Sequence, residues 1–563
     1  MNKVKKQGKR VLSFLLCTAL AMSGLIVSTK QVRAEESQAQ ETPTTTKTIA
    51  GLGTSVIVDP TAPANDTDAW KGSYVYYGNY DADGDGTAEP VKYRVLDAST
   101  TDYSADGTTQ TMFLDCDSIL YYTPFDNDGT ANEDGKKAND WSISDVKNSL
   151  NGDGFLNKEG VFTTAEKNAI AASTVDTHAL TTDSETGINV AEWTQSTFVN
   201  YVALTGEQIF LLDAEDVSNG AYGYSMAREN CENRKKKTGS SAAYWWLRSA
   251  DDSSDYYAGF VSDDGYINHI SVNYNHPGVS PALNLNLSSV LFSSANAVSK
   301  SSALTSGSTA IGTEANTDWK LTLKDDAKSV KLTEGRSVTK ASDGTITVPY
   351  TYKDKENATE KEKVNQISVM ITDKAYDAEK AVNAQEAQIL YYGALQDIKN
   401  AEGNKSTVAE TSTGTGTFAL PNALTEKMQG EDYHIYLLAE HVNADNSTDY
   451  ASEPKEVTAI LEEVDTVTVP SIDTPIAEEP LKEEITVSST GVAEKATLTW
   501  KKNDTEATGN AQWKTTYQAY VTLTAADGYA FTDTTEATLN EQPVSEMTAV
   551  SPASAAKYFF NSL

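Results

Sequence analysis

Short runs in which apolar and polar residues alternate make up most of the chain after Trp70, and Gly, Asp, Asn or Pro bounds many of them. A period of two residues is typical of β-strands, and the bounding residues are typical of turns. The pattern therefore predicts a β-rich protein. The first predicted strands are "SYVYYGNY", "PVKYRVLDA" and "QTMFLDC", and more follow in "YWWLRSADDSSDYYAGFVSDDGYINHISVNYNHPGVSPALNLN" from Tyr244 to Asn286.

Two helices interrupt these strands. Ser142-Ile143-Ser144-Asp145 has the form of a capping box, with Ile143, Val146 and Leu150 on one face behind it. Thr163-Thr164-Ala165-Glu166 is a second box ahead of Ala169 and Ile170. Strands and helices together predict an α+β first domain that ends near Ala295.

The rest of the chain reads as all-β. In the middle, Ile367, Val369 and Ile371 alternate with polar residues and Met370, which predicts a half-buried strand. Seven such strands over about 130 residues predict an immunoglobulin-like sandwich. A similar module follows, and "SPASAAKYFFNSL" shows no closing strand, so this module is interpreted as incomplete. The seven runs are "KSVKL", "TITVPYTY", "VNQISVMITD", "AQILYYGAL", "GTFALP", "YHIYLLAEHV" and "EPKEVTAIL".

The expected fold class is therefore multidomain, with an α+β first domain and two all-β immunoglobulin-like domains, and 563 residues suffice for about three domains. We expect a signal peptide over 1–34, a disordered tail over 35–68, the α+β binding domain over 69–296, a sandwich with a leading connector over 297–463, an acidic Pro-containing linker over 464–484 and the last module over 485–563.

The signal peptide is predicted from "MNKVKKQGKR", an apolar run to Val27 and the small residue Ala34. The alternative is a membrane anchor, for which the apolar run is short. Residues 1–34 carry seven basic and no acidic residues, so their removal takes the net charge from −35 to −42. An acidic surface repels nucleic acid and anionic membranes, and it keeps a secreted protein in solution. We expect an extracellular or cell-surface protein with no nucleic-acid partner and no membrane insertion after cleavage.

Two cysteines, Cys116 and Cys231, remain after cleavage. In an oxidising compartment they can form one disulfide, which would contribute up to roughly 5 kcal/mol. Two unpaired buried thiols are the alternative, and the sequence leaves both open.

One loop has the spacing of a calcium site. "YDADGDGTAEPVKY" places Asp81, Asp83 and Asp85 two residues apart, and Glu89 could add a ligand. An EF-hand needs a bidentate Glu at its twelfth position, where this chain has Lys92. The favoured interpretation is an acidic hairpin turn, with calcium as the alternative and no other cofactor expected.

Motifs that would indicate an enzyme are absent from the sequence. The five histidines have no zinc-site spacing, and no nucleophile elbow or phosphate loop is present. The many acidic residues leave a carboxylate-dependent hydrolase open. "RKKK" at 234–237 is the only basic cluster after the signal peptide and is interpreted as an exposed loop, with docking of an anionic polysaccharide as the alternative.

Several ordered motifs resemble a known but uncharacterised domain of exported proteins of Gram-positive gut bacteria. They run from "VYYGNY" through "WSISDVKNSLN", "FTTAEKNAI" and "GEQIFLLDAEDV" to "YWWLRSADDS" and "PGVSPALNLN". The resemblance covers about Trp70 to Phe292. Ser280 departs from it, since the family usually has Arg there, and a salt bridge of that Arg would be missing here.

Trp-Leu-Arg-Ser and Gly-Val-x-Pro-Ala-Leu also resemble the C-type-lectin-like fold, including its formylglycine-generating-enzyme branch and variable phage receptor-binding domains. The likeness implies a fold and no activity. Cys116 and Cys231 match no oxidase motif of that branch. Glu89-Pro90-Val91 and Asn139-Asp140-Trp141 match no lectin sugar motif. The later modules resemble the immunoglobulin-like spacers of bacterial surface proteins.

The ligand residues are expected in the turns of the Tyr244–Asn286 stretch. Trp245 and Trp246 are interpreted as core, and Arg248 as the partner of a buried carboxylate or the anchor of a turn. Tyrosine rings stack on sugars while amides bond hydroxyls, although a solvated rim of turn residues is the alternative. The candidates are Tyr256, Tyr257, Tyr266, Asn268, Asn273, Tyr274 and Asn275.

We therefore expect an exported bacterial surface or secreted protein whose first domain binds a glycan or host protein without catalysis. The alternatives are a secreted carboxylate-dependent hydrolase and a structural spacer without a ligand.

Overall fold

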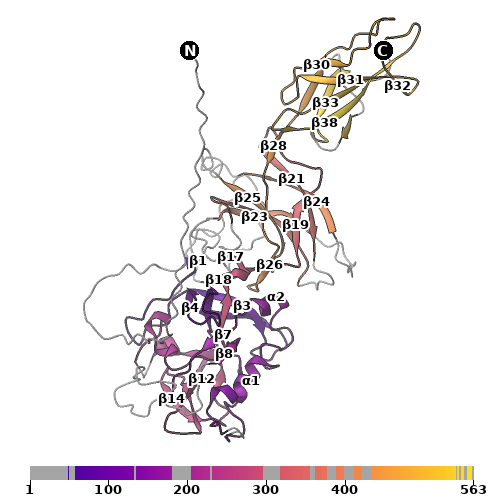
Figure 1. Ribbon diagram of the computed structural model, residues 1–563. Helices are drawn as coiled ribbons and strands as arrows, with labels where there is room; N and C mark the ends of the chain where they lie inside the picture. Colours follow the sequence, from indigo (N-terminus) through magenta and orange to yellow (C-terminus); the bar gives the residue numbers. More distant parts are fainter. Residues whose placement is uncertain are drawn as a thin grey trace, which may run out of the picture. The chain divides into compact units, whose positions relative to one another are not determined.

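Figure 1 shows the computed structural model of the chain. No described helix is long and apolar enough to span a bilayer. The predicted signal peptide, residues 1–34, and much of the predicted tail, residues 35–68, lie outside the described part. The structure describes residues 48–49, 57–131, 135–180, 204–227, 231–295, 318–354, 362–376, 389–398, 411–420, 433–539, 542–543, 547–550 and 555–560.

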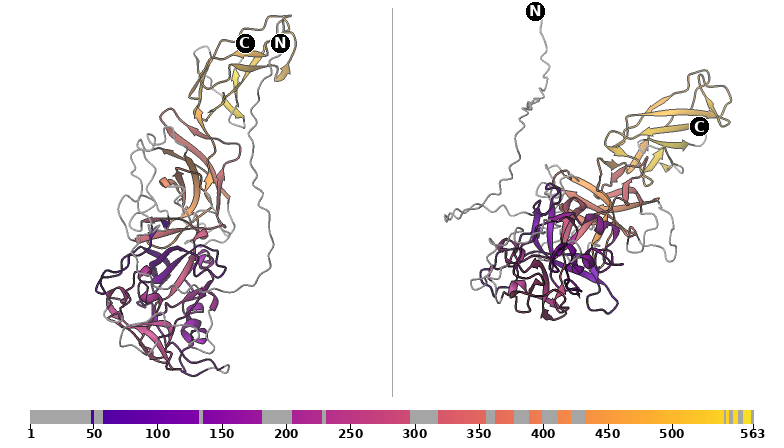
Figure 2. Two further views of the ribbon diagram at one scale, coloured as in Figure 1. Left: turned by 60° about the vertical axis from the view of Figure 1, so that its left-hand side comes forward. Right: turned by 60° about the horizontal axis from the view of Figure 1, so that its bottom comes forward.

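The described chain is mostly β-structure in several sheets, as the alternating pattern predicts. In the first domain, one sheet holds three early strands and two strands that come much later in the chain, each antiparallel to its neighbours among these five (Figure 2). Its strands there are β3 (Tyr74–Tyr80), β4 (Glu89–Thr100), β5 (Thr111–Cys116), β16 (Ala282–Asn286) and β9 (Ile209–Phe210), in that order.

A second, five-stranded sheet carries the Trp-Leu-Arg-Ser motif in its central strand, which is buried throughout. The central strand is antiparallel to one neighbour and parallel to the other. The strand order is β14 (Ile267–Ser271), β13 (Tyr257–Val261), β12 (Trp245–Ala250), β15 (Gly278–Val279) and β6 (Tyr121–Tyr122).

Both predicted helices are present. The helix α2 (Thr164–Ala169) has the full capping box of Thr163 and Glu166. The helix α1 (Asp145–Asn151) begins two residues later than its predicted box, because Ser144 and not Ser142 accepts the capping bond. A short 3-10 helix over Trp141–Ile143 occupies the intervening turn. Val146 and Leu150 are buried, as the periodicity predicts.

The end of the predicted tail is ordered. The strand β2 (Ile57–Val58) begins this part, and Ile57 is buried in the first core. Asp66 accepts a backbone bond from Glu232, and the Ser225 hydroxyl also bonds Asp66. These contacts hold residues 57–68 against the first domain, so the prediction of disorder is wrong for them.

The strand β18 (Asp318–Lys324) joins the first domain to the next one. It pairs in parallel with β3 and with β26 (Asp449–Ala451), and antiparallel with β17 (Val290–Ala295). Its residues Trp319, Leu321 and Leu323 are buried in the first core. The core of the first domain therefore extends past its predicted end at residue 296.

The middle module has all seven predicted strands. The alternation of β22 (Gln366–Thr372) separates two cores, since Ile367, Val369 and Ile371 pack in one and Met370 in the other. Every residue of β22 is buried, so the predicted half-buried strand is wrong. The others are β19 (Ser329–Leu332), β20 (Val338–Lys340), β21 (Thr345–Lys353), β23 (Ile389–Asp397), β24 (Thr411–Ala419), β25 (His434–His441), β27 (Lys455–Glu456) and β28 (Ile460–Glu463).

The last module differs from its prediction at both ends. Val467 and Val469 of β29 (Thr466–Val469) are buried in its core, although residues 464–484 read as a poorly packed linker. The strand β38 (Ala555–Phe560) pairs with β33 (Gln518–Thr524), so a closing strand exists. The other strands are β30 (Glu484–Thr486), β31 (Lys495–Lys502), β32 (Thr505–Ala507), β34 (Tyr529–Ala530), β35 (Glu536–Leu539), β36 (Gln542–Pro543) and β37 (Met547–Val550).

Candidate functional site

The hairpin of β13 and β14 separates the predicted ligand residues onto two faces. Phe260 lies opposite Asn268, and Tyr257 lies opposite Ser271. Because neighbouring residues of a strand point to opposite faces, Phe260 and Asn268 share one face while Tyr257 and His269 share the other. The candidate residues therefore do not form a single surface.

The first of these faces carries a chain of four contacting rings, which we call the aromatic face: Phe260, Tyr244, His276 and Tyr274. The Tyr244 ring lies 5.2 Å from the rings of both Phe260 and His276, measured between centroids. The His276 ring lies 5.8 Å from that of Tyr274, which is 44% exposed. Phe260 is buried, so the chain of rings runs from the core to the solvent.

Amides and a further ring surround the aromatic face. Asn273 and Asn275 are exposed on either side of Tyr274 in the turn, and Asn268 is half-buried. Tyr122 of β6 is exposed and pairs with Gly278, two residues after His276. A side chain at position 278 would collide with Ile119 and crowd the Tyr122 ring, so the close pairing of this strand with β6 requires glycine there. The face thus combines aromatic rings with amide donors and acceptors.

On the opposite face, Tyr257 stacks on His269 with 5.3 Å between ring centroids and 2° between ring planes. The His269 Nδ1 lies 2.6 Å from an oxygen of the buried Asp251. Burial raises the pKa of Asp251, but bonds from His269 and Ser253 outweigh it and lower the pKa below its usual value. This anchored pair is small and separate from the aromatic face.

The two remaining candidate tyrosines are half-buried. The Tyr256 ring lies against Gly129, where a side chain would clash with it, and packs on the first core. Tyr266 ends the β13–β14 turn, where its backbone N–H donates to Ser262 and Asp264. Both residues therefore contribute to packing or turn structure.

A buried charge network holds the motif strand β12 in place. Arg248 bonds Asp216 at 2.7 Å and Asp213 at 3.1 Å, as the interpretation of a buried pair predicts. Asp213 also lies 2.8 Å from His178, whose other ring nitrogen lies 2.6 Å from Glu215.

The network shifts the pKa of His178, Asp213 and Asp216. Burial lowers the pKa of His178, but its two carboxylate partners outweigh this and raise it to about 10. Burial raises the pKa of Asp213, yet Arg248 and His178 hold it at about 2. Burial and then the charge of Asp213 raise the pKa of Asp216 to about 6. Shifted carboxyl groups are typical of catalytic sites, but these are buried and bonded to a cation, which indicates a structural role.

The "RKKK" segment is not an exposed loop. Arg234 is buried and donates to four backbone carbonyls, those of Gly265, Val217, Ser225 and Ala227. Burial lowers the pKa of Arg234 to about 10. The prediction is therefore wrong for Arg234, because backbone oxygens replace water around its charge.

Lys236, in β10 (Lys236–Thr238), is also buried, and its Nζ lies 2.5 Å from Asp115 and 2.8 Å from the Ser280 hydroxyl. Tyr224 donates a second bond to Asp115 at 2.5 Å. The Ser280 position, where relatives usually have Arg, therefore still lies beside a cation. Burial lowers the pKa of Lys236, and the attraction of Asp115 opposes this.

Cys116 and Cys231 are both buried, and the structure has no disulfide between them. Burial raises the pKa of Cys116 to about 11 and also raises that of Cys231. The Cys231 thiol donates to the carbonyl of Ala227, while the Cys116 sulfur lies beside the Ser118 hydroxyl. Of the two alternatives, the structure has two buried thiols and not the disulfide.

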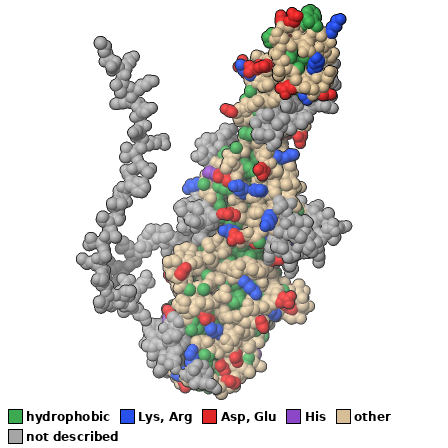
Figure 3. All heavy atoms as spheres, turned by 45° about the vertical axis from the view of Figure 1, so that its right-hand side comes forward, with side chains coloured by type: hydrophobic (Ala, Val, Ile, Leu, Met, Phe, Trp, Pro, Cys, Tyr) green, Lys and Arg blue, Asp and Glu red, His purple; other side chains and the backbone are tan. Residues whose placement is uncertain are grey.

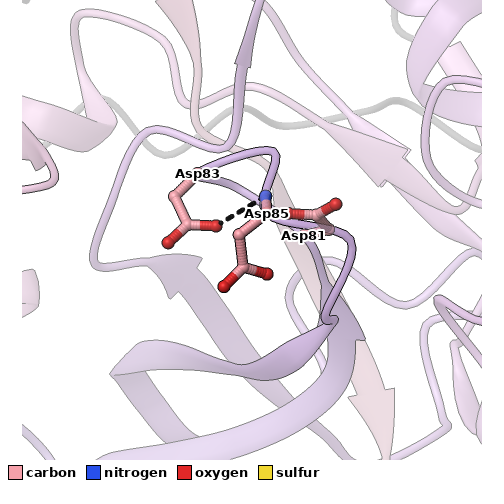
Figure 4. A group of neighbouring side chains, drawn as sticks. All are labelled: Asp81, Asp83 and Asp85. Atoms are coloured by element: carbon pink, nitrogen blue, oxygen red, sulfur yellow. Dashed lines mark hydrogen bonds between the residues drawn. The ribbon is translucent and has the colours of Figure 1, made fainter.

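The predicted calcium loop brings three of its four carboxylates together (Figure 4). Oxygens of Asp81, Asp83 and Asp85 lie within 4.8 Å of one another. Both Asp81 oxygens accept backbone N–H groups, from Gly84 and Gly86. Glu89 begins β4 and is not part of this group. The carboxylates therefore close an exposed turn, which is the interpretation favoured by the sequence.

Sequence reasoning missed three residues of the aromatic face, Phe260, Tyr244 and His276, and also the neighbouring Tyr122. Tyr244 directly precedes the buried pair of tryptophans, and Tyr122 lies on a distant segment. His276 shares the "NYNHPG" turn with Tyr274, which is the one signal that could have identified it.

Comparison with protein families gives one match. Residues 109–287 match the Domain of unknown function (DUF6273). The DUF6273 match covers less than half of the chain, includes the whole aromatic face and excludes the Asp81 loop. It supports the predicted resemblance to an uncharacterised domain. None of the curated proteins and none of the solved structures matches the chain.

Proposed function

We propose that this is an exported bacterial surface or secreted protein whose DUF6273 region binds a glycan or a host protein without catalysis. The observation that carries the proposal is the aromatic face, where four contacting rings lead from the core to the exposed Tyr274. In this proposal the first domain is C-type-lectin-like and the later modules are immunoglobulin-like spacers.

The chemistry of the face favours a saccharide. A tyrosine ring covers the apolar side of a sugar, and neighbouring amides bond its hydroxyls. Asn273 and Asn275 are exposed on either side of Tyr274, where their amides could bond sugar hydroxyls in this way. The rings also pack on the core, since Phe260 is buried and the Tyr244 ring contacts it. A rigid face loses little conformational entropy when a ligand binds.

The test is a glycan-array and mucin-binding screen of residues 35–563. The whole segment is needed because β18 completes the first core. Tyr274→Ala removes an exposed ring, and Tyr433→Ala is the matched control, since Tyr433 is 38% exposed in the middle module. We expect saturable binding that Tyr274→Ala weakens about tenfold, equivalent to about 1.4 kcal/mol.

Two results would refute the proposal: no binding to any glycan or mucin, or equal binding by the Tyr274→Ala protein. Release of reducing sugar that stops when one carboxylate is neutralised would instead support the hydrolase. If the protein shows neither binding nor turnover, the structural spacer is the alternative that remains. Repeating the screen with a chelator tests whether the Asp81 loop takes part.

A further inference from the structure

The last module exposes one large aromatic side chain. Trp513 is 72% exposed, whereas the other tryptophans in the described part of the chain are buried: Trp70, Trp141, Trp245, Trp246, Trp319 and Trp500. Ile476 nearby in the fold is 62% exposed. Figure 3 shows hydrophobic side chains among acidic and basic ones on the visible surface of the last module. Single exposed apolar side chains are common on protein surfaces, but this indole is also held by a hydrogen bond to a neighbouring loop.

The Trp513 ring is held in place by a second loop. Its Nε1 donates to the carboxylate of Glu478 at 3.1 Å. The Glu478 backbone N–H donates to the carbonyl of Ala511 at 2.8 Å, and its carbonyl accepts from the Asn510 side chain at 2.7 Å. Pro480 and Asn510 also form a β-bridge between the two loops. The exposed ring therefore has a fixed edge and a free face.

The backbone on both loops is strained where it presents this ring. Glu478 has φ 73° and Lys514, next to the tryptophan, has φ 56°. A side chain in this left-handed region costs about 1–2 kcal/mol per residue. Strain of this kind persists where the structure is constrained, and it gathers at binding loops.

The groups around the ring suit a neutral, hydroxyl-rich ligand. The carboxylate of Glu478 bonds the indole, and the Asn510 amide bonds the Glu478 carbonyl. Gln512 directly precedes Trp513, and Lys502 bonds its side-chain oxygen at 2.5 Å. Carboxylates and ammonium groups are both present, so the surface selects no single charge. One Trp and one Ile are far less than the roughly 800 Å² per partner of a stable protein interface.

We propose that Trp513 forms a second saccharide site, on the last module, where a pyranose ring of a neutral polysaccharide stacks on the indole. Glu478, Asn510 and Gln512 bond its hydroxyls. The site is separate from the aromatic face, so the two proposals stand or fall independently.

The experiment is affinity electrophoresis of residues 35–563 in gels containing glycogen, barley β-glucan or arabinoxylan. We expect at least one polysaccharide to retard the protein, Trp513→Ala to abolish the retardation and Trp513→Phe to keep part of it. Tyr274→Ala should keep the retardation that Trp513 provides. Because Trp513 is exposed, Trp513→Ala should melt at the same temperature as the unaltered chain, which confirms that it folds.

Acrylamide quenching gives a second readout. The difference between the unaltered chain and Trp513→Phe isolates the Trp513 fluorescence, and the retarding polysaccharide should protect it. The proposal is overturned if no polysaccharide retards the chain, or if Trp513→Ala is retarded equally. It is also overturned if the chain self-associates through Trp513 and quenching depends on protein concentration alone.

Discussion

Replacing Lys236 with Met tests whether the buried charges hold the first domain together. The ammonium group is inaccessible to solvent and lies 2.5 Å from Asp115, which is also inaccessible. Met keeps most of the aliphatic stem over the Trp245 ring, which the ammonium group approaches to 3.9 Å. The substitution therefore leaves a buried carboxylate with Tyr224 as a neutral partner. Breaking a buried pair in this way costs about 3–5 kcal/mol.

The assay is hydrogen exchange followed by mass spectrometry, because it reports the local opening free energy of β5 in a chain with several modules. Lys495→Met is the control, since the Lys495–Glu484 pair is exposed and its loss should leave exchange unchanged. Adding Asp115→Asn to Lys236→Met should recover part of the loss, because the carboxylate that lost its cation partner is then neutral as well. A change below about 1 kcal/mol for Lys236→Met, or additive effects in the double variant, would refute the reasoning.

Three further predictions concern titration, metal binding and thiols. The raised pKa of His178 contributes stability below pH 6.5 that is lost as the pH rises toward 10. In urea unfolding, the difference in unfolding free energy between the unaltered chain and His178→Gln should therefore shrink across that range. A difference that stays constant with pH would contradict this prediction. Calcium should bind the Asp81 loop no more tightly than about 10⁻⁴ M in calorimetry, because it lacks a bidentate Glu, and a micromolar Kd would show this to be wrong. Because both cysteines are buried, native residues 35–563 should not react with a thiol reagent, and the protein unfolded in guanidinium should show two reactive thiols. A Cys116–Cys231 disulfide would instead give no reactive thiol in either state.

Local signals predicted much of the fold. Alternation located the strands of the middle module because each packs at least one face on a core. The box of Thr163 and Glu166 located α2 because both of its bonds form within four residues. The pairing of Arg248 with a carboxylate followed from its place in an apolar strand, where an unpaired charge is costly.

Other features depended on partners far away in the chain. The partner of Lys236 lies 121 residues earlier, so a basic run that is solvated in most sequences is buried here. The alternation of residues in β22 predicts two different faces of the strand. It does not reveal that a second core covers the face of Met370. Tyr122, which pairs with Gly278 near the aromatic face, comes from a separate segment of the chain, so no spacing within the Tyr244–Asn286 stretch could reveal it.

The most direct test of the proposed function is the affinity of residues 35–563 for one oligosaccharide that the array selects, measured by calorimetry. The aromatic face predicts one-to-one binding that weakens about tenfold in Tyr274→Ala and stays unchanged in Tyr433→Ala and Trp513→Ala. Equal affinity in Tyr274→Ala and the unaltered chain would contradict the assignment of this face as the binding site.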